Sequence, residues 1–244
     1  MSSLISIVIP SYNYGKYIGN CLFSCLNQGI NEEYNVIVID DGSTDDSVSI
    51  IKKYDVTLIK LDKNYGYSKA KNEGIILSRS KYIVHLDADD LLTPDSLQVR
   101  LNEFKKDDSL MLVHGRAYNI GEDTTYKWAI SNQRKLDYID CGAQIHAQGV
   151  MIKRECYENY GLYDESLKAK ADREMWDRLK LIAKVKSKFT PKFVAFYRIH
   201  PGSMIWNRDS NPKHNKMVVE RYNQAFTLRQ REGITPLNTR FINN

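Results

Sequence analysis

The chain has 244 residues, of which 42% are hydrophobic and 27% are charged, so it can bury the core of one large domain. Its net charge of +5 is too modest to indicate nucleic-acid binding. No stretch approaches the roughly 18 apolar residues of a membrane-spanning helix. The N-terminus lacks a basic region and reaches Pro10 early, which favours a strand over a signal peptide. The four cysteines form no C-x-x-C pair, which indicates a reduced, cytoplasmic protein without a zinc site.

Apolar runs alternate with helical spacings along the first hundred residues. Short apolar runs bounded by polar signals predict buried strands, here at Ile5–Ile9, Asn35–Ile39, Val56–Leu61 and Tyr82–Leu86. Apolar residues at helical spacing follow each of these strands. This alternation predicts an α/β fold with an open, mainly parallel sheet flanked by helices.

The strict alternation stops after residue 104. Further strands are expected at Leu110–His114, Gly149–Lys153 and Phe193–Tyr197. Residues Asn119–Gln144 are polar and irregular, which is typical of a functional loop. A helix is expected to begin at Asp172.

A basic helical tail is expected over residues 205–244. It holds seven Lys or Arg residues against three acidic ones, and so contributes +4 of the net charge. One hypothesis is peripheral docking on an anionic membrane surface. The alternative is a solvated helix packed on the domain.

Polar motifs follow three of the expected strands, at Pro10–Asn13, Asp40–Ser43 and Asp87–Asp90. Ligands of open α/β sheets bind beyond the carboxyl ends of the strands, where all three motifs should lie. The third motif places three carboxylates within four residues, which is unfavourable unless a cation neutralises them. Carboxylate oxygens so spaced suit Mg²⁺ or Mn²⁺ shared with a diphosphate. The alternative is a solvated acidic turn.

Several other classes of site are excluded. The chain has no G-x-G-x-x-G, no P-loop motif and no G-x-S-x-G elbow. An EF-hand fails because Leu91 and Leu92 occupy positions that a calcium loop needs. Phosphatases with an aspartyl nucleophile need a second Asp where this chain has Gly42. What remains is a carboxylate and metal site on a nucleotide-binding sheet.

Eight segments in order resemble family 2 glycosyltransferases, over about residues 4 to 204. They are Ser6–Asn13, Val38–Asp45, Asn64–Gly74, Leu86–Asp90, Gly149–Arg154, Gly161–Leu167, Ala171–Leu179 and Tyr197–Ser203. The resemblance implies a GT-A fold, a Rossmann-like nucleotide-binding domain over residues 1–204 with a C-terminal helical tail. Residues 1–115 would form the nucleotide-binding half and residues 116–204 the acceptor and catalytic half.

The resemblance also implies a donor site. Pro10, Tyr12 and Asp41 would flank the base and ribose, although Asp41 could instead cap a turn. Further nucleotide-binding candidates are Asn13, Asn64, Lys69, Asn72, Asp87, Ala88 and Asp89. Both Asn64 and Asn72 could simply brace a turn. Lys69 and Lys71 could neutralise the charge of the phosphates, but one of the two side chains is expected to be merely solvated.

The metal, Mn²⁺ or Mg²⁺, would bind Asp89 or Asp90. His200 would be a further ligand or a donor to the diphosphate, although a lone His is more often structural. Asp172 matches the catalytic carboxylate of the family, the base that takes the acceptor's proton. A helix N-cap is a second and compatible role for it. Ala171 stands where the family often has Glu, which leaves the acceptor contacts open.

The expected activity is inverting transfer of a sugar from a UDP-sugar to an acceptor hydroxyl in polysaccharide or glycan synthesis. The acceptor would be a glycan, a lipid-linked molecule or a protein. A nucleotidyltransferase that makes nucleotide sugars is an alternative, but the chain lacks the expected glycine-rich first loop. A non-catalytic subunit is another, against which the intact Asp87 and Asp172 argue.

Overall fold

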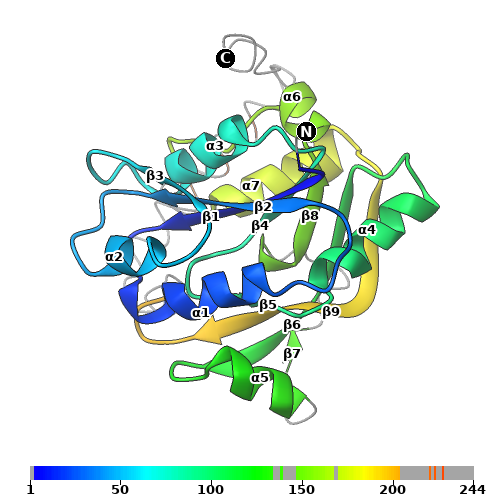
Figure 1. Cartoon of the computed structure of the whole chain (residues 1–244). Coiled ribbons are helices and arrows are strands. Elements are labelled where there is room, and N and C mark those ends of the chain that lie inside the picture. Colours follow the sequence, from blue (N-terminus) through cyan, green and yellow to red (C-terminus); the bar gives the residue numbers. More distant parts are fainter. Residues whose placement is uncertain are drawn as a thin grey trace.

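A computed structural model describes residues 3–133, 138–139, 147–167 and 170–203, together with residues 220, 223 and 227. Its core is a twisted sheet with helices on both faces (Figure 1). The strands are β1 (Ile5–Ser11), β2 (Tyr34–Asp40), β3 (Thr57–Lys60), β4 (Tyr82–His85), β5 (Leu91–Leu92), β6 (Leu112–Gly121), β7 (Tyr138–Ile139), β8 (Val150–Lys153) and β9 (Ser187–Ile199). The helices are α1 (Gly15–Leu26), α2 (Ser47–Ile51), α3 (Tyr67–Leu77), α4 (Ser96–Lys106), α5 (Tyr126–Asn132), α6 (Glu155–Tyr160) and α7 (Ala171–Asp177), with short turns η2 (Ala147–Gly149) and η3 (Arg178–Ile182).

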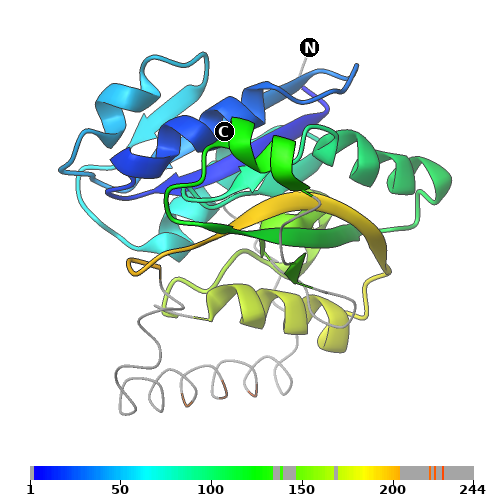
Figure 2. The ribbon, with the colours of Figure 1, turned by 90° about the horizontal axis from the view of Figure 1, so that it is seen from below.

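The strands follow the order β3-β2-β1-β4-β8-β6-β9-β5, and β7 pairs with β6. From β3 to β4 all neighbours are parallel. The direction changes at β8, which lies antiparallel to both β4 and β6. Strands β6 and β9 then form a long parallel pair, seen side by side in Figure 2. The sheet is therefore mixed, with most of its paired residues in parallel ladders, as the sequence predicts.

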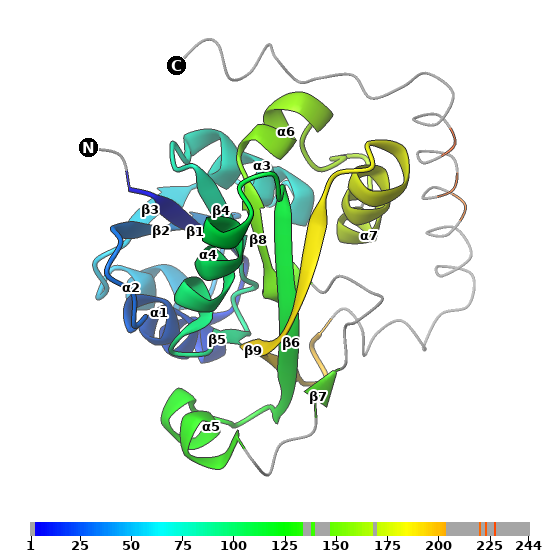
Figure 3. The same cartoon turned by 90° about the vertical axis from the view of Figure 1, so that its right-hand side faces the viewer.

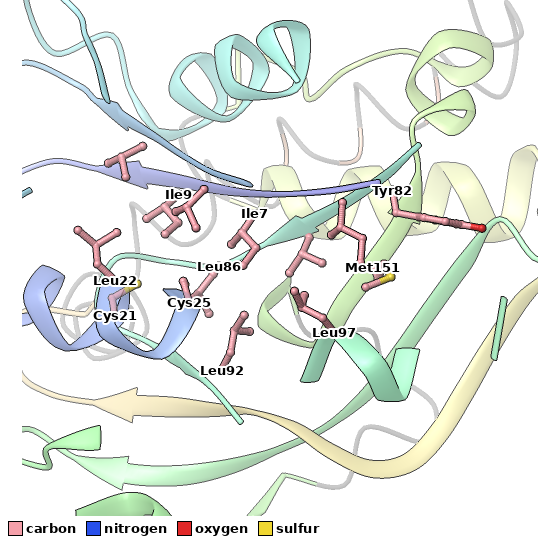
Figure 4. Close-up of a cluster of buried hydrophobic side chains, with 14 of the residues drawn as sticks. Ile7, Ile9, Cys21, Leu22, Cys25, Tyr82, Leu86, Leu92, Leu97 and Met151 are labelled. Carbon is pink, nitrogen blue, oxygen red and sulfur yellow. The ribbon is translucent and has the colours of Figure 1, made fainter. Parts of the chain in front are cut away.

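Strand β1 is buried throughout because helices cover both of its faces. Ile7 and Ile9 pack with Cys21, Cys25 and other residues on the side of α1 and α4 (Figure 4). Val8 points the other way, into a cluster that α3, α6 and α7 close. Cys21 and Cys25 are free, buried core thiols.

The segment expected to be irregular contains ordered structure. Strand β6 continues to Gly121 because β9 supplies parallel partners as far as Ile199. Helix α5 then begins after Thr125, whose Oγ1 accepts a hydrogen bond from the Trp128 backbone N–H at 3.3 Å. Tyr126 of this helix packs in a small core cluster with strands β6 and β9. Figure 3 shows α5 beyond the end of β6. The prediction of an irregular loop was wrong for these residues.

The tail expected over residues 205–244 lies outside the described residues except at positions 220, 223 and 227. The division into a domain over 1–204 and a tail therefore stays a prediction. Within the described part of the chain, no helix is both long enough and apolar enough to cross a bilayer.

A buried ion pair holds α7 and η3 in place. Glu174 and Arg178 are both 0% exposed and bond twice, at 3.0 Å each. The guanidinium also donates to the Gly161 carbonyl at 3.1 Å and to the Leu162 carbonyl at 2.8 Å. This pair fixes the helix that carries Asp172 against the segment that follows α6.

Removing the cation of this pair is expected to destabilise the fold strongly. The substitution Arg178→Met should lower the free energy of unfolding by about 3–5 kcal/mol, because it leaves Glu174 buried and unpaired. Urea denaturation measures the change. The matched control is Arg173→Met, which breaks the i,i+4 pair of the exposed Arg173 with Asp177 and should cost at most about 1 kcal/mol. Equal losses in the two variants would contradict the role given to the buried pair.

Candidate active site

The loops after β1 and β2 are joined through Asn13. Its Oδ1 accepts hydrogen bonds from the backbone N–H of Thr44 at 2.8 Å and of Asp45 at 3.3 Å. Its own N–H donates to Ser43 Oγ at 2.9 Å. Asn13 has a φ of 57°, in the left-handed region that Asn tolerates better than most residues. Asn13 therefore braces two loops, and its role as a nucleotide contact stays a prediction.

Asp41 caps the turn that leads into α3. Its two carboxylate oxygens accept from the backbone N–H groups of Tyr65 at 2.8 Å and Gly66 at 2.7 Å. This is the alternative role that the sequence left open. A carboxylate offers about four lone-pair sites, so a nucleotide donor can still bond to it.

The other residues predicted to flank the base lie near Asp41. Pro10 is buried in β1 opposite Ile39, one residue before the end of β2. Tyr12 follows this strand and is 40% exposed. The exposed Asn64 passes against Gly42, where an added Cβ would lie 2.9 Å from the Asn64 nitrogen. The carboxyl ends of β1 and β2 thus bring together Asp41, Pro10 and Asn64. Tyr12 lies directly after the end of β1.

The predicted nucleotide contact at Asn72 is wrong. Asn72 is 1% exposed, and its amide bonds to the Tyr163 backbone N–H and carbonyl, at 2.9 Å each. The same amide donates to Glu165 Oε1 at 2.9 Å, so Asn72 is a structural brace. Lys69 forms an i,i+4 ion pair with Glu73, and its contact with a nucleotide stays a prediction.

Lys71, which the sequence left as the alternative to Lys69, is the lysine at the site. Its ammonium lies 3.0 Å from Asp172 Oδ1 and 3.8 Å from Asp87 Oδ1, and the side chain is 0% exposed. Tyr67 Oη donates to Asp87 Oδ1 at 2.8 Å and lies 3.2 Å from Asp172 Oδ2. The two donors link the strand-end carboxylate to the predicted base.

Asp87 is held from both sides. Its second oxygen accepts from Gln148 Nε2 of η2 at 3.1 Å. Burial, together with the charges of Asp172 and Asp89, raises the pKa of Asp87 to about 6 against the opposing effect of Lys71. Tyr67 and Gln148 are site residues that sequence reasoning missed. In the sequence, Tyr67 has the helical spacing of a core residue with Ala70 and Leu77, and a lone Gln before an expected strand carries no signal.

Asp172 is not an N-cap. Helix α7 begins at Ala171, and the capping position is Lys170, with a φ of 61° and no side-chain cap. Asp172 lies in the first turn, and its carboxylate faces Lys71 and Tyr67. The N-cap interpretation is therefore wrong, while the position suits a base.

The other two carboxylates of the strand end have different surroundings. Asp89 Oδ2 lies 2.9 Å from His200 Nε2. Asp90 is 0% exposed, and its Oδ1 accepts from the Arg198 backbone N–H at 2.7 Å. Burial and the charges of Asp89 and Asp87 raise the pKa of Asp90 well above its usual range. Asp90 therefore serves the packing of β9, and Asp89 is the carboxylate that pairs with His200.

Arg198 joins this turn to the segment after β6. Its Nε donates to the Asp89 carbonyl at 2.7 Å. One terminal nitrogen donates to the carbonyls of Gly121, Glu122 and Thr124, each at 2.9 Å. The guanidinium lies over the Tyr17 ring, which in turn packs on His200. Asp89 and His200 are positioned by this network.

Asp89 and His200 offer the oxygen and nitrogen ligands that a Mn²⁺ or Mg²⁺ site uses. Among the residues that the structure describes, no group of three His, Cys, Asp or Glu side chains is arranged to hold a metal. Such a site would have to share its ion with a ligand such as a diphosphate. Ala88, between Asp87 and Asp89, is 1% exposed with its methyl group in the core, so it can offer only its backbone.

The fold and this strand-end site define the class of protein. Residues 6–161 match the model of glycosyl transferase family 2, and the chain belongs to that family. It is 34% identical to chondroitin synthase of Escherichia coli over 192 residues, which cover 75% of this chain and 27% of that protein. The chain spans about a quarter of the length of the synthases that it matches.

Solved structures share the fold. TarS 1–349 from S. aureus in complex with UDP-GlcNAc superposes with a TM-score of 0.66 at 18% identity, over 83% of this chain and 60% of that chain. The mannosyltransferase PcManGT from Pyrobaculum calidifontis, in complex with GDP-Man and Mn²⁺, gives a TM-score of 0.67 at 18% identity, over 86% and 61% of the two chains. The expected GT-A fold is thereby confirmed.

A buried histidine beneath the site should make stability depend on pH. His85 is 0% exposed, and its Nε2 contacts the Tyr157 hydroxyl. Its ring also packs edge-on against the rings of Tyr157 and Tyr163. Burial, and then the charge of Lys71, lower its pKa well below 6.5. The folded protein therefore keeps His85 neutral, whereas the unfolded chain gains a proton below about pH 6.5.

The contribution of His85 to stability is therefore present above pH 6.5 and lost as the pH falls. When the pH falls from 7.5 to 5.5, the free energy of unfolding should decrease in both proteins. The decrease should be about 1.4 kcal/mol larger for the wild type than for the His85→Gln variant. Other titrating groups occur in both proteins and cancel in this difference. Denaturant titrations at the two pH values test it, and parallel losses would show that His85 is protonated in the fold.

Proposed function

We propose that this chain transfers a sugar from a nucleotide-diphosphate sugar, a UDP-sugar, to an acceptor hydroxyl with inversion at the anomeric carbon. The observation that carries the proposal is the hydrogen-bonded cluster of Asp172, Lys71, Tyr67 and Asp87. It links a candidate base to the carboxyl end of β4. In open α/β sheets this is the edge at which ligands bind.

Asp172 is the general base of the reaction. Its carboxylate takes the proton of the acceptor hydroxyl while the hydroxyl oxygen bonds to the anomeric carbon. The bond from that carbon to the diphosphate oxygen breaks in the same displacement, and the nucleoside diphosphate leaves with the electron pair. Because the acceptor attacks from the side opposite the diphosphate, the configuration at the carbon inverts.

The donor side of the site needs a cation. The N–H groups at the start of α1 and before α3 already bond to carboxylates, Gly15 to Asp45 and Gly66 to Asp41. Helix N-termini often bind phosphates through their free N–H groups. At α1 and α3, acidic side chains already accept hydrogen bonds from these groups. Asp89 and His200 would hold a Mn²⁺ or Mg²⁺ ion, which when bound supplies positive charge to the departing diphosphate. Mn²⁺ in the PcManGT structure supports this choice.

Similarity to chondroitin synthase supports a role in polysaccharide synthesis, and the UDP-GlcNAc complex of TarS supports a UDP-sugar donor. The acceptor is a hydroxyl of a glycan, a lipid-linked molecule or a protein. Peripheral membrane contact through residues 205–244 stays a prediction.

The activity is tested with a panel of nucleotide sugars and Mn²⁺, scored by release of nucleoside diphosphate. The substitution Asp172→Asn should lower the transfer rate about 10²–10⁴-fold, because it removes the base. Calorimetric titration should show unchanged binding of the nucleoside diphosphate. Wild-type turnover by this variant would refute the assignment of the base.

The two neighbouring carboxylates should differ in their effect on metal dependence. The substitution Asp89→Asn should raise the Mn²⁺ concentration for half-maximal activity about tenfold or more, because it weakens a ligand. The matched variant Asp90→Asn should leave this concentration nearly unchanged, since Asp90 is buried and bonds to β9. A larger effect at Asp90 than at Asp89 would reverse the assignment.

A further inference from the structure

Lys71 is a fully buried cation between carboxylates from the two halves of the chain. Its ammonium lies 3.0 Å from Asp172 and 3.8 Å from Asp87. The rings of Tyr67 and Tyr163 lie 4.2 and 5.1 Å from the ammonium, where their faces attract a cation. A buried ammonium is costly unless it is paired in this way, so the position is specific.

One face of α3 binds the segment that leads into α7. Residues three and four positions apart share a helix face, and Ser68, Lys71 and Asn72 are so related. Ser68 Oγ donates to the Leu167 carbonyl at 3.4 Å, and Asn72 bonds to Tyr163 and Glu165. Lys71 adds the bond to Asp172 itself. Helix α3 therefore positions the segment and the carboxylate together.

The surroundings of Lys71 do not suit a phosphate ligand. The side chain is 0% exposed, and two carboxylates and two aromatic rings surround its ammonium. Tyr67 supplies the second donor of the cluster. Burial, with Asp172 and Asp87, raises the pKa of Tyr67 well above its usual range, so its hydroxyl keeps the proton that it donates.

We propose that Lys71, with Tyr67, is a positioning residue that orients the Asp172 carboxylate toward the acceptor, and not a ligand of the donor diphosphate. Each oxygen of Asp172 faces one of these donors, so rotation of the carboxylate is restricted while further lone pairs stay available for the acceptor proton. The inference rests on the proposed function and adds to it the residues through which the base acts.

The test uses Lys71→Met, which keeps an unbranched side chain but removes the charge. Its kcat should fall about tenfold to a hundredfold, while the donor KM and the Kd for the nucleoside diphosphate change less than about threefold. The conservative variant Lys71→Arg should recover part of the lost kcat, because a guanidinium can still donate to Asp172. Lys106→Met, which removes an exposed, ion-paired lysine of α4, is the matched control and should keep wild-type kinetics.

The decisive measurement repeats Lys71→Met in the Asp172→Asn background. If Lys71 acts through Asp172, the residual activity should not fall further. An additional fall of the same size as in the wild-type background would overturn the inference. So would a loss of nucleoside diphosphate binding as large as the loss of transfer, which would make Lys71 a phosphate ligand.

A milder variant guards against loss of folding in Lys71→Met. Tyr67→Phe removes one hydroxyl and should lower kcat up to about tenfold with unchanged donor KM. The positioning role would be refuted if Tyr67→Phe, Lys71→Arg and Lys71→Met all kept the kcat of the wild type. A wild-type protein that releases nucleoside diphosphate from no donor would instead refute the proposed function, and this inference with it.

Discussion

Crowding of negative charge at the carboxyl ends of the parallel strands is the constraint on which this structure depends. A carboxylate that leaves water needs donors, and three of the carboxylates here take theirs from distant parts of the chain. Asp41 takes the N–H groups before α3. Asp172 takes Lys71 from α3, and Asp90 takes the backbone of β9. Satisfying these charges therefore assembles α3, α7 and β9 around one edge of the sheet.

The strand end divides its carboxylates between two sides. Asp87 bonds to the cluster around Asp172, whereas Asp89 faces His200. Between them, the methyl group of Ala88 is anchored in the hydrophobic core, so the two flanking side chains have a rigid support. A glycosyl transfer has two charge problems, a proton to remove from the acceptor and a diphosphate to release. Under the proposed function, Asp87 lies on the side of the candidate base and Asp89 on the side of the candidate metal site.

The apolar runs predicted the parallel half of the sheet, and the rule for open sheets predicted where the acidic motifs meet. Hydrogen-bond partners far away in the sequence could not be predicted. Asn13 and Asn72 are polar residues at the expected edge, but their amides bond to loops 31 and 91 residues further along. The choice between Lys69 and Lys71 depended on which side of α3 faces α7. Similarly, β6 is long because β9 lies beside it, which local periodicity does not record.

The bonds of Arg198 limit where the chain after β6 can change in length. One guanidinium bonds both to the Asp89 carbonyl and to three carbonyls between Gly121 and Thr124. Connecting segments usually tolerate insertions. Here the residues from Gly121 to Thr124 are bonded to the same guanidinium as the turn that carries Asp89, so an insertion among them would strain that turn. Changes of length after Thr124 leave these bonds intact.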